Sequence, residues 1–229
     1  MDNSVTFDLA KQTVRELNQF LHSGLAGSTR AVRVINPDGA HSIAVGVNAA
    51  IEIGIEGHVG YYAAGMNRLA SVVIDGNAGP GVAENMMSGF VHVKGFTSGS
   101  AGASANGGLL VIDGDAGLRC GIAMKGADIV VGGSVGAFSG FMAQAGSLVV
   151  CGDAGDALGD SLYEAVIYVR GRISSCGADA HEEPMGDSDH ARLTDLLKAA
   201  GFKHQSREFK RVASMRGLYH WNAEANQEY

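Results

Sequence analysis

Apolar residues recur along this chain at a fixed interval of 19 residues, in phase with glycine. The glycines are Gly57, Gly76, Gly95, Gly114, Gly133, Gly152 and Gly171. One apolar ladder lies two residues before them, at Ile55, Ile74, Val93, Ile112, Val131, Val150 and Val169. A second ladder lies four residues before them, at Ile53, Val72, Val91, Leu110, Ile129, Leu148 and Ile167. A period of this length, held at three positions at once, predicts a solenoid.

Each 19-residue unit is expected to form one coil. Its two apolar positions are two residues apart, so on a strand both side chains point to the same face. A Gly-x-x-Gly segment such as 76–79 follows, and its glycines would permit a sharp corner at positive φ. The pattern predicts an all-β solenoid: a right-handed parallel β-helix of about seven 19-residue coils, with short N- and C-terminal helices. At about 4.8 Å between coils, the rod would be roughly 30 Å long.

The chain divides into three predicted regions. Residues 1–42 would form a capping helix over 8–22, with Asp8 as its N-cap, and an irregular first coil with a strand at 31–35. Residues 43–177 would form the parallel β-helix. Residues 178–229 would form a polar linker, a helix that begins at Ser188 or Asp189 and ends at Gly201, and a basic tail. This tail is interpreted as a cap or a docking arm.

One further ladder is unusual for a solvated sheet. Three residues before the corner glycines lie Val73, His92, Val111, Val130, Val149 and Tyr168, which would point outward. A strand that is apolar on both faces is usually covered on both. Either the chain's own terminal helices cover this stripe, or another subunit does. On the second interpretation, Val73, Val111, Val130, Val149 and Tyr168 are candidate interface residues, and Val130→Asp would impair assembly whereas Val131→Asp would unfold the rod.

Composition narrows the possible functions. The formal charge of −7 argues against nonspecific nucleic-acid binding. The chain shows neither a basic, apolar export signal after Met1 nor an apolar run of membrane-spanning length, so a cytoplasmic protein is expected. The three cysteines, Cys120, Cys151 and Cys176, have no CxxC spacing, and this argues against a disulfide framework.

No motif for catalysis or cofactor binding emerges. The glycines do not form a GxGxxG or Walker-A loop, and they recur on every coil as structural corners would. The GDAG segments at 114–117 and 152–155 do not belong to a complete calcium repeat, because the equivalent segments 76–79 and 133–136 lack the aspartate. Methionines at similar coil positions are expected to fill gaps in the core: Met66, Met86, Met87, Met124 and Met142. Catalytic, cofactor-binding and metal-binding residues are therefore expected to be absent from this chain.

The segment Val14-Arg15-Glu16-Leu17-Asn18, followed by a Gly-x-x-Gly solenoid of this coil length, resembles the GXGXG domain of glutamate synthase. The resemblance covers about residues 5–175. It is strongest to stand-alone versions of that domain, among them the small β-helix subunit of N-methylglutamate synthase. The Arg-Glu-Leu-Asn segment separates this group from the β-helix subunit of formylmethanofuran dehydrogenase and of the related formyltransferase/hydrolase complex.

The resemblance implies a noncatalytic subunit that holds two partners in register. One partner would be a glutamine-amidotransferase-like subunit, and the other would carry FMN and an iron–sulfur cluster. In N-methylglutamate synthase the complex joins methylamine to glutamate and releases ammonia. Arg15, Glu16, Asn18 and His22 are candidate docking residues; alternatively, they form only the polar face of a capping helix. Other possibilities are a β-helix subunit of a formyl-transfer complex and a free-standing β-helix enzyme or binding module.

Overall fold

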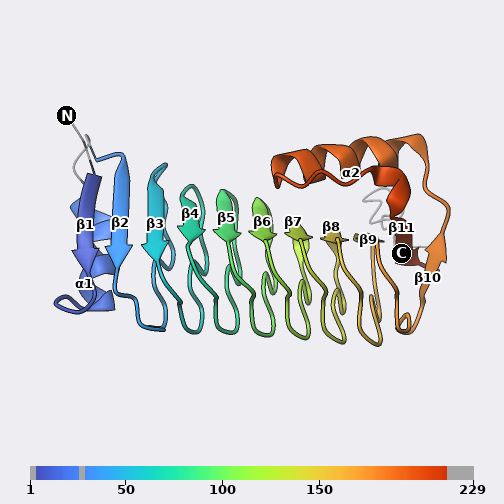
Figure 1. The fold of residues 1–229 in the computed structure, drawn as a ribbon, viewed down its shortest axis with the longest axis horizontal. Coiled ribbons are helices and arrows are strands. Elements are labelled where there is room, and N and C mark those ends of the chain that lie inside the picture. The colour runs from blue at the N-terminus through green and yellow to red at the C-terminus, as the bar shows by residue number, and fades with distance from the viewer. Residues whose placement is uncertain (1–3, 26–28, 216–229) are drawn as a thin grey trace, which may run out of the picture.

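The computed structural model describes residues 4–25 and 29–215, which form a rod built on one continuous sheet (Figure 1). The sheet order is β1-β2-β3-β4-β5-β6-β7-β8-β9-β11-β10. Its strands are β1 (Ser4–Asp8), β2 (Ala31–Ile35), β3 (Glu52–Glu56), β4 (Ser71–Ile74), β5 (Phe90–Val93), β6 (Leu109–Ile112), β7 (Lys125–Val131), β8 (Ala145–Val150), β9 (Val166–Val169), β10 (Ala180–Glu183) and β11 (Lys210–Ser214). The helices are α1 (Val14–Gln19), a π-helical turn (Phe20–Gly24), α2 (Asp187–Ala199) and a 3₁₀ turn (Ser206–Glu208).

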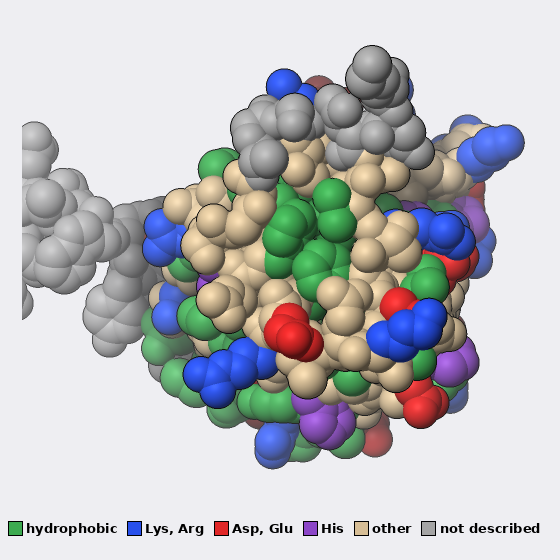
Figure 2. All heavy atoms as spheres, turned by 90° about the vertical axis from the view of Figure 1, so that its left-hand side faces the viewer, with side chains coloured by type: hydrophobic (Ala, Val, Ile, Leu, Met, Phe, Trp, Pro, Cys, Tyr) green, Lys and Arg blue, Asp and Glu red, His purple; other side chains and the backbone are tan. Residues whose placement is uncertain are grey.

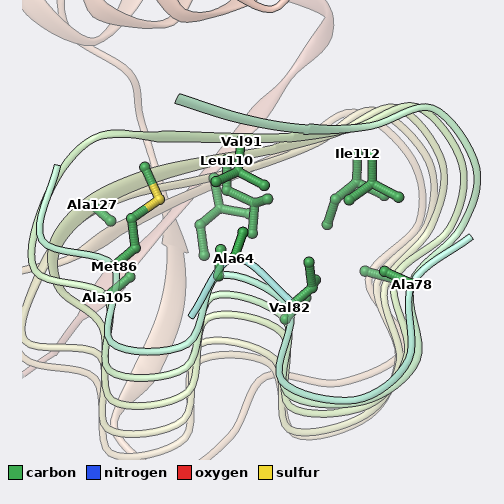
Figure 3. Close-up of a cluster of buried hydrophobic side chains, with 14 of the residues drawn as sticks. Ala64, Ala78, Val82, Met86, Val91, Ala105, Leu110, Ile112 and Ala127 are labelled. Atoms are coloured by element: carbon green, nitrogen blue, oxygen red, sulfur yellow. The ribbon is translucent and has the colours of Figure 1, made fainter. Parts of the chain in front are cut away.

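The predicted parallel β-solenoid is confirmed. From β3 to β9 each strand pairs in parallel with the next, and Ile53 lies beside Val72, which lies beside Val91. A second parallel ladder joins the corners, where Ala78 bridges to Thr97. The two apolar ladders point into the rod and are at most 1% exposed. Ala78, Val82 and Met86 from the other sides of the coil are buried with them (Figure 3).

The N-terminal end differs from the prediction because the sheet begins earlier. β1 pairs in parallel with β2, the predicted strand at 31–35, and β2 pairs in parallel with β3. Asp8 ends β1 and does not cap a helix; its carboxylate accepts hydrogen bonds from the Ala10 amide and the Asn36 side chain. The helix starts after Thr13, whose side chain accepts from the Glu16 N–H. Figure 2 shows this end of the rod, where a small hydrophobic group is bordered mainly by backbone and uncharged polar atoms, and most charged and histidine side chains lie further out.

The glycines lie at the corners of the coil, as predicted, but the predicted reason for glycine at these positions is wrong for most of them. Among the seven, only Gly57 has positive φ, at 132°. At Gly76 a Cβ atom would lie 2.6 Å from the backbone carbon of Gly57, and at Gly152 it would lie 2.6 Å from that of Gly133. The glycines also form a ladder in which the Gly95 N–H donates to the Gly76 carbonyl over 3.0 Å. Glycine is therefore required here because successive coils stack in direct backbone contact.

The C-terminal region closes the rod with antiparallel strands. β11 pairs with β9 and with β10, so the predicted polar linker at 180–184 contains a strand, and part of the predicted basic tail is another. α2 begins after Gly186, slightly before the predicted start. It ends at Ala199, and the predicted stop, Gly201, follows the C-cap residue Ala200 with a φ of +82°. Figure 1 shows α2 lying along the outer side of the sheet. The apolar residues Leu218, Tyr219 and Trp221 lie outside the described residues.

Candidate interaction surfaces

The C-terminal half of the outward stripe is covered by the chain itself. Val130, Val149 and Tyr168 on β7, β8 and β9 are at most 2% exposed. They form a second apolar cluster with four residues of the C-terminal region, Leu193, Leu196, Leu197 and Phe209. Val111 on β6 is fully buried as well. In this half of the stripe, the chain's own C-terminal helix covers the outward residues, and no other subunit is needed to bury them. These four stripe residues are not available for direct contact with another subunit.

Polar contacts hold α2 in this position. Arg192 makes a bidentate ion pair with Asp128 of β7, at 2.6 and 2.7 Å. The Tyr168 hydroxyl donates to the Asp189 carboxylate over 2.8 Å, and the Arg211 Nε donates to the same oxygen over 2.9 Å. Burial, together with the neighbouring Asp189 carboxylate, raises the pKa of Tyr168. These contacts join α2 to strands β7, β9 and β11 of the sheet. The position of α2 is therefore fixed by directional contacts as well as by apolar packing.

The N-terminal half of the outward stripe remains accessible. Val73 and His92 are half-buried, and Gly54 beside them is exposed. Polar contacts occupy this part of the sheet: His92 Nε2 lies 2.8 Å from the Asp113 carboxylate, Lys94 lies 3.3 Å from Asp75, and Arg33 pairs with Glu56 through two guanidinium nitrogens. We name the outer face of β3, β4 and β5 the open sheet face. It combines a narrow apolar centre with a charged rim, as protein contact surfaces do.

The candidate docking residues of the N-terminal helix mainly contact their own chain. The Glu16 carboxylate accepts from the Thr13 N–H over 2.7 Å, which completes a capping box. The Asn18 side chain donates to the Ser42 carbonyl over 2.8 Å, and the His22 Nε2 lies 2.7 Å from the Val45 carbonyl oxygen. Arg15 is exposed and makes no hydrogen bond or ion pair within the described residues. Glu16 therefore caps its own helix, whereas Asn18 and His22 attach α1 and its π-helical extension to the first coil.

Two shallow hollows lie beside this helix. One, of about 710 Å³, is lined by the outer side of α1 and includes Arg15, Asn18 and His22. The Asn18 Oδ1 is buried and has no partner among the described residues. The other hollow, of about 850 Å³, lies between the start of α1 and the first corners and includes Asn36, Asp38 and His58. Neither hollow brings together residues in a catalytic arrangement, so both are shallow depressions of the surface at the N-terminal end.

Thr13→Ala is expected to lower the free energy of unfolding by about 1 kcal/mol, because it removes the N-cap of α1. Hydrogen bonds from Thr13 lower the pKa of Glu16 in the folded state. The stabilisation by this carboxylate is therefore present above its unfolded pKa and is lost as the pH falls through the lowered folded value. Urea denaturation at pH 7 measures the loss, and amide exchange localises it to α1. Unchanged exchange protection of α1 in the variant would contradict this role for Thr13.

Sequence reasoning missed a polar ladder that immediately follows the corner glycines. The side chain of one coil accepts a hydrogen bond from the backbone N–H at the same position of the next coil. The acceptors are His58, Asn77, Asp115, Ser134 and Asp153. The recurrence of acceptor side chains directly after the glycines was the available signal. It also explains the aspartates of the GDAG segments without calcium, because each carboxylate already serves a backbone amide.

The described residues contain no group of three or more histidine, cysteine or acidic side chains arranged to hold a metal ion. Cys120 is buried inside the rod, and burial raises its pKa to about 12. Cys151 is buried beneath the C-terminal cap, and burial raises its pKa to about 11. Both thiols therefore stay protonated at neutral pH and are unsuited to nucleophilic catalysis or to binding a cluster.

The methionines divide between the core and the surface. Met86 and Met124 are fully buried, as predicted, but Met66, Met87 and Met142 expose 43%, 44% and 40% of their area. The prediction that all five fill core gaps is therefore wrong for these three. They lie on the turns of the coil, where the side chain points away from the rod.

Comparison with known proteins identifies a full-length relative. The chain is 51% identical over 224 residues to a Rhizobium meliloti (strain 1021) protein named Protein GlxC, and the match covers 97% of this chain and 98% of the relative. The aligned region therefore extends well beyond the coils into the terminal regions. No family model matches the chain, and no solved structure matches it. Within the part of the chain that the structure describes, no helix is long and apolar enough to cross a membrane.

Proposed function

Because this chain belongs to the family that includes Protein GlxC of Rhizobium meliloti, we propose that it is a noncatalytic scaffold subunit of a glutamate-synthase-like FMN enzyme complex. The observation that carries the proposal is the parallel pairing of the coils in steps of 19 residues from β3 to β9, which continues past one register shift between Lys125 and Asp128 of β7. Backbone hydrogen bonds run along this length on both the strand side and the corner side. A rod of this kind keeps attached proteins at a fixed separation.

The complex is proposed to be N-methylglutamate synthase, which converts methylamine and L-glutamate to N-methyl-L-glutamate and ammonia, in the cytoplasm. This assignment rests on the resemblance of the Arg15-Glu16-Leu17-Asn18 segment and the glycine corners to the GXGXG domain. One partner is a glutamine-amidotransferase-like subunit. The other supplies FMN and the iron–sulfur cluster, which suits the chemistry of this chain because its buried cysteines are unsuited to binding a cluster.

The open sheet face is the proposed contact for one of these partners. Val73 and His92 lie at its centre, half-buried and uncovered by α2. The Lys94–Asp75 ion pair and the contact between His92 and Asp113 are already formed within the chain, so a partner can cover Lys94 without leaving that charge unpaired. Arg15, with no ion-pair partner among the described residues, lies at the N-terminal end and provides a second point of contact.

Purification of the tagged full-length chain from the cells that produce it tests the proposal. We expect an amidotransferase-like subunit and a flavoprotein to copurify, with FMN released by acid and with iron–sulfur absorbance. Val73→Glu is expected to reduce the recovered flavin about tenfold, because it places a charge at the apolar centre of the contact. Ser98→Glu, at an exposed corner on another side of the coil, is the matched control and should leave recovery unchanged.

Two outcomes would overturn the proposal. Turnover of glutamate and methylamine by the purified chain alone would show that it is not a scaffold. A zinc amidohydrolase-like partner in place of the flavoprotein would assign the chain to a formyl-transfer complex. Equal loss of flavin from Val73→Glu and Ser98→Glu would place the contact elsewhere than on the open sheet face.

A further inference from the structure

On the side of the rod opposite the strands, each coil makes two bends, separated by a buried segment that includes Val82 and, in the preceding coil, Ala64 (Figure 3). In the coil whose corner is Gly76, Gly81 comes directly before Val82, and Glu84 comes two residues after it. These two residues therefore lie on either side of the inward segment. Glycine at position 81 leaves room for the side chain of Glu84.

Three side chains converge on the space beside Gly81. A Cβ atom at this glycine would lie 2.7 Å from the Glu84 Oε2, 3.5 Å from the Tyr61 Cε2 and 3.8 Å from the Tyr62 Cδ2. The two tyrosines come from the preceding coil, and their stacked rings have centroids 5.5 Å apart. The Glu84 carboxylate therefore lies beside two aromatic rings.

Tyr62 is held in this position by its own coil and by the next one. Its ring lies on Gly65, where a Cβ atom would come within 2.6 Å of the ring carbon Cε1. Its hydroxyl oxygen lies 3.5 Å from the side-chain nitrogen of Asn85, the neighbour of Glu84. One wall of the space beside Gly81 is therefore fixed before anything binds there, which lowers the entropy cost of binding.

The Glu84 carboxylate has no counter-ion within the described part of the chain. It forms neither an ion pair nor a side-chain hydrogen bond there; burial raises its pKa, and no neighbouring charge contributes to the shift. A carboxylate that is partly removed from water without a partner is destabilised. A cation that entered the space beside Gly81 would offset this cost, so the free chain has a specific requirement for positive charge at this point.

The aromatic rings favour a guanidinium group as this cation. An arginine side chain stacks on aromatic rings and donates two parallel hydrogen bonds to one carboxylate, so it can use the rings and the Glu84 oxygens together. A lysine ammonium group is compact and strongly hydrated, and it gains less beside a carboxylate that keeps part of its contact with water. Charge and shape therefore select arginine among the cationic side chains.

The surroundings favour a cation carried by a protein over a small molecule. Met66 lies beside Glu84, because its N–H donates to the Glu84 carbonyl over 2.8 Å. Met66 and Tyr61 expose 43% and 48% of their area. A small free cation would therefore remain largely in water here, whereas sites for small molecules enclose most of the ligand. A protein surface would cover both apolar side chains while it supplied the cation.

We propose that Glu84, together with Tyr61 and Tyr62, binds an arginine side chain of a partner protein. The inference rests on the proposed function for the identity of that partner, which is the amidotransferase-like subunit, since the flavin subunit is the one expected to leave with Val73→Glu. Glu84 and the open sheet face lie on opposite sides of the rod, so the two contacts do not compete. The scaffold then holds one partner on each side.

Amide NMR of the purified full chain tests the arginine site without any partner. The probe is N-acetyl-L-arginine amide, and N-acetyl-L-norleucine amide is the uncharged control. We expect the arginine probe alone to shift the Gly81 and Tyr62 signals, with a dissociation constant in the millimolar range. Glu84→Gln should weaken its binding about tenfold, because a neutral amide replaces the charged acceptor. Asp195→Asn, which removes an exposed carboxylate from α2, is the matched control and should bind the probe as the wild type does.

Copurification from the cells that produce the protein tests the occupant. The tagged full-length chain with Glu84→Gln should recover about tenfold less of the amidotransferase-like subunit than the wild type, because a desolvated charge pair at the contact is lost. The same variant should recover as much flavin as the wild type. Asp195→Asn should recover both subunits in full. The remainder of the amide spectrum, unshifted in each variant, confirms that the rod is folded.

Two results would overturn the proposal while leaving the scaffold function in place. One is an arginine probe that does not shift the Gly81 signal, or that binds Glu84→Gln as tightly as the wild type. The other is full recovery of the amidotransferase-like subunit by Glu84→Gln. Failure of the scaffold function gives a different result, because the wild-type chain then recovers neither subunit. That result removes the amidotransferase-like occupant, and the probe titration still decides whether Glu84 binds a guanidinium group.

Discussion

Val131→Asp is expected to unfold the rod. Val131 lies on β7 with its side chain in the main core, and it has no exposed area. An aspartate there would place a carboxylate among the apolar ladders of three coils, where no cation is available to pair with it. A buried unpaired charge of this kind lowers the free energy of unfolding by about 4 kcal/mol or more. Loss of the β-sheet circular dichroism signal at 25 °C measures the effect, and a urea midpoint equal to that of the wild type would contradict it.

Val130→Asp is the matched comparison, one residue earlier on the same strand. Val130 is also fully buried, but in the second cluster beneath α2. The prediction that an aspartate at this position acts mainly on assembly is therefore wrong, because the side chain is covered by Leu193, Leu196 and Leu197. We expect this variant to detach α2 and to increase amide exchange in that helix, while the coils from β2 to β6 keep their protection. Full unfolding of both variants would show that the two clusters form one cooperative unit.

Gly76→Ala is expected to lower the free energy of unfolding by about 3 kcal/mol, through overpacking between coils. The added Cβ would lie 2.6 Å from the backbone carbon and oxygen of Gly57, and backbone atoms of a hydrogen-bonded ladder cannot move aside. The thermal midpoint and the urea midpoint both measure the change.

Gly54→Ala is the control for this substitution. Gly54 lies on β3, has no atom within 4 Å of the added Cβ, and has no positive φ. Alanine is therefore expected to leave stability unchanged or to raise it by about 0.5 kcal/mol, through the lower entropy of the unfolded chain. If Gly76→Ala and Gly54→Ala destabilised the protein equally, direct backbone contact between coils would not be the reason that glycine is required at the corner.

The coils could be predicted from the sequence because one physical requirement repeats in every unit. Stacking places the same position of each coil in the same environment. Ile55 and Val131 must therefore both be apolar, although they are 76 residues apart. The end of the rod has no such repetition. β1 has only Val5 and Phe7 as alternating apolar residues, too short a signal to distinguish from a loop. The true helix start had a local signal, the Thr13-x-x-Glu16 capping box, which competed with Asp8.

The sequence was sufficient to predict that the outward stripe is buried, but not whether α2 or a partner protein buries it. Val130, Val149 and Tyr168 required an apolar partner on the outer face, and any amphipathic helix satisfies that requirement. The leucines of α2 show only that the helix has an apolar side, which a partner protein could equally have covered. The deciding contacts, Arg192 with Asp128 and Arg211 with Asp189, join residues far apart in the sequence and were not visible in any local pattern.

The exposed apolar residues on the side of the rod away from the strands were missed for a related reason. Positions there follow the 19-residue period but not one residue type, so Tyr62, Gly81, Ser100 and Phe138 occupy equivalent sites without forming a ladder. A core position must keep its character from coil to coil, whereas a surface position is free to vary. Function on this rod is therefore expected at positions where equivalent residues differ, and the structure is needed to show which of those positions lie side by side.

The direct stacking of coils has a consequence for how such a rod can change in evolution. Gain or loss of one whole 19-residue unit among the coils keeps the core ladders continuous, because the neighbours on either side present the same ladders. Each such event moves one end of the rod relative to the other by about 4.8 Å and turns it by the twist of one coil. Intermediate distances are excluded, because every coil adds one strand to the sheet whatever its length: the coil from β2 to β3 takes 21 residues, pairing Ala31 with Glu52, and still adds one strand. The length of this rod can therefore change only in whole steps of one strand spacing.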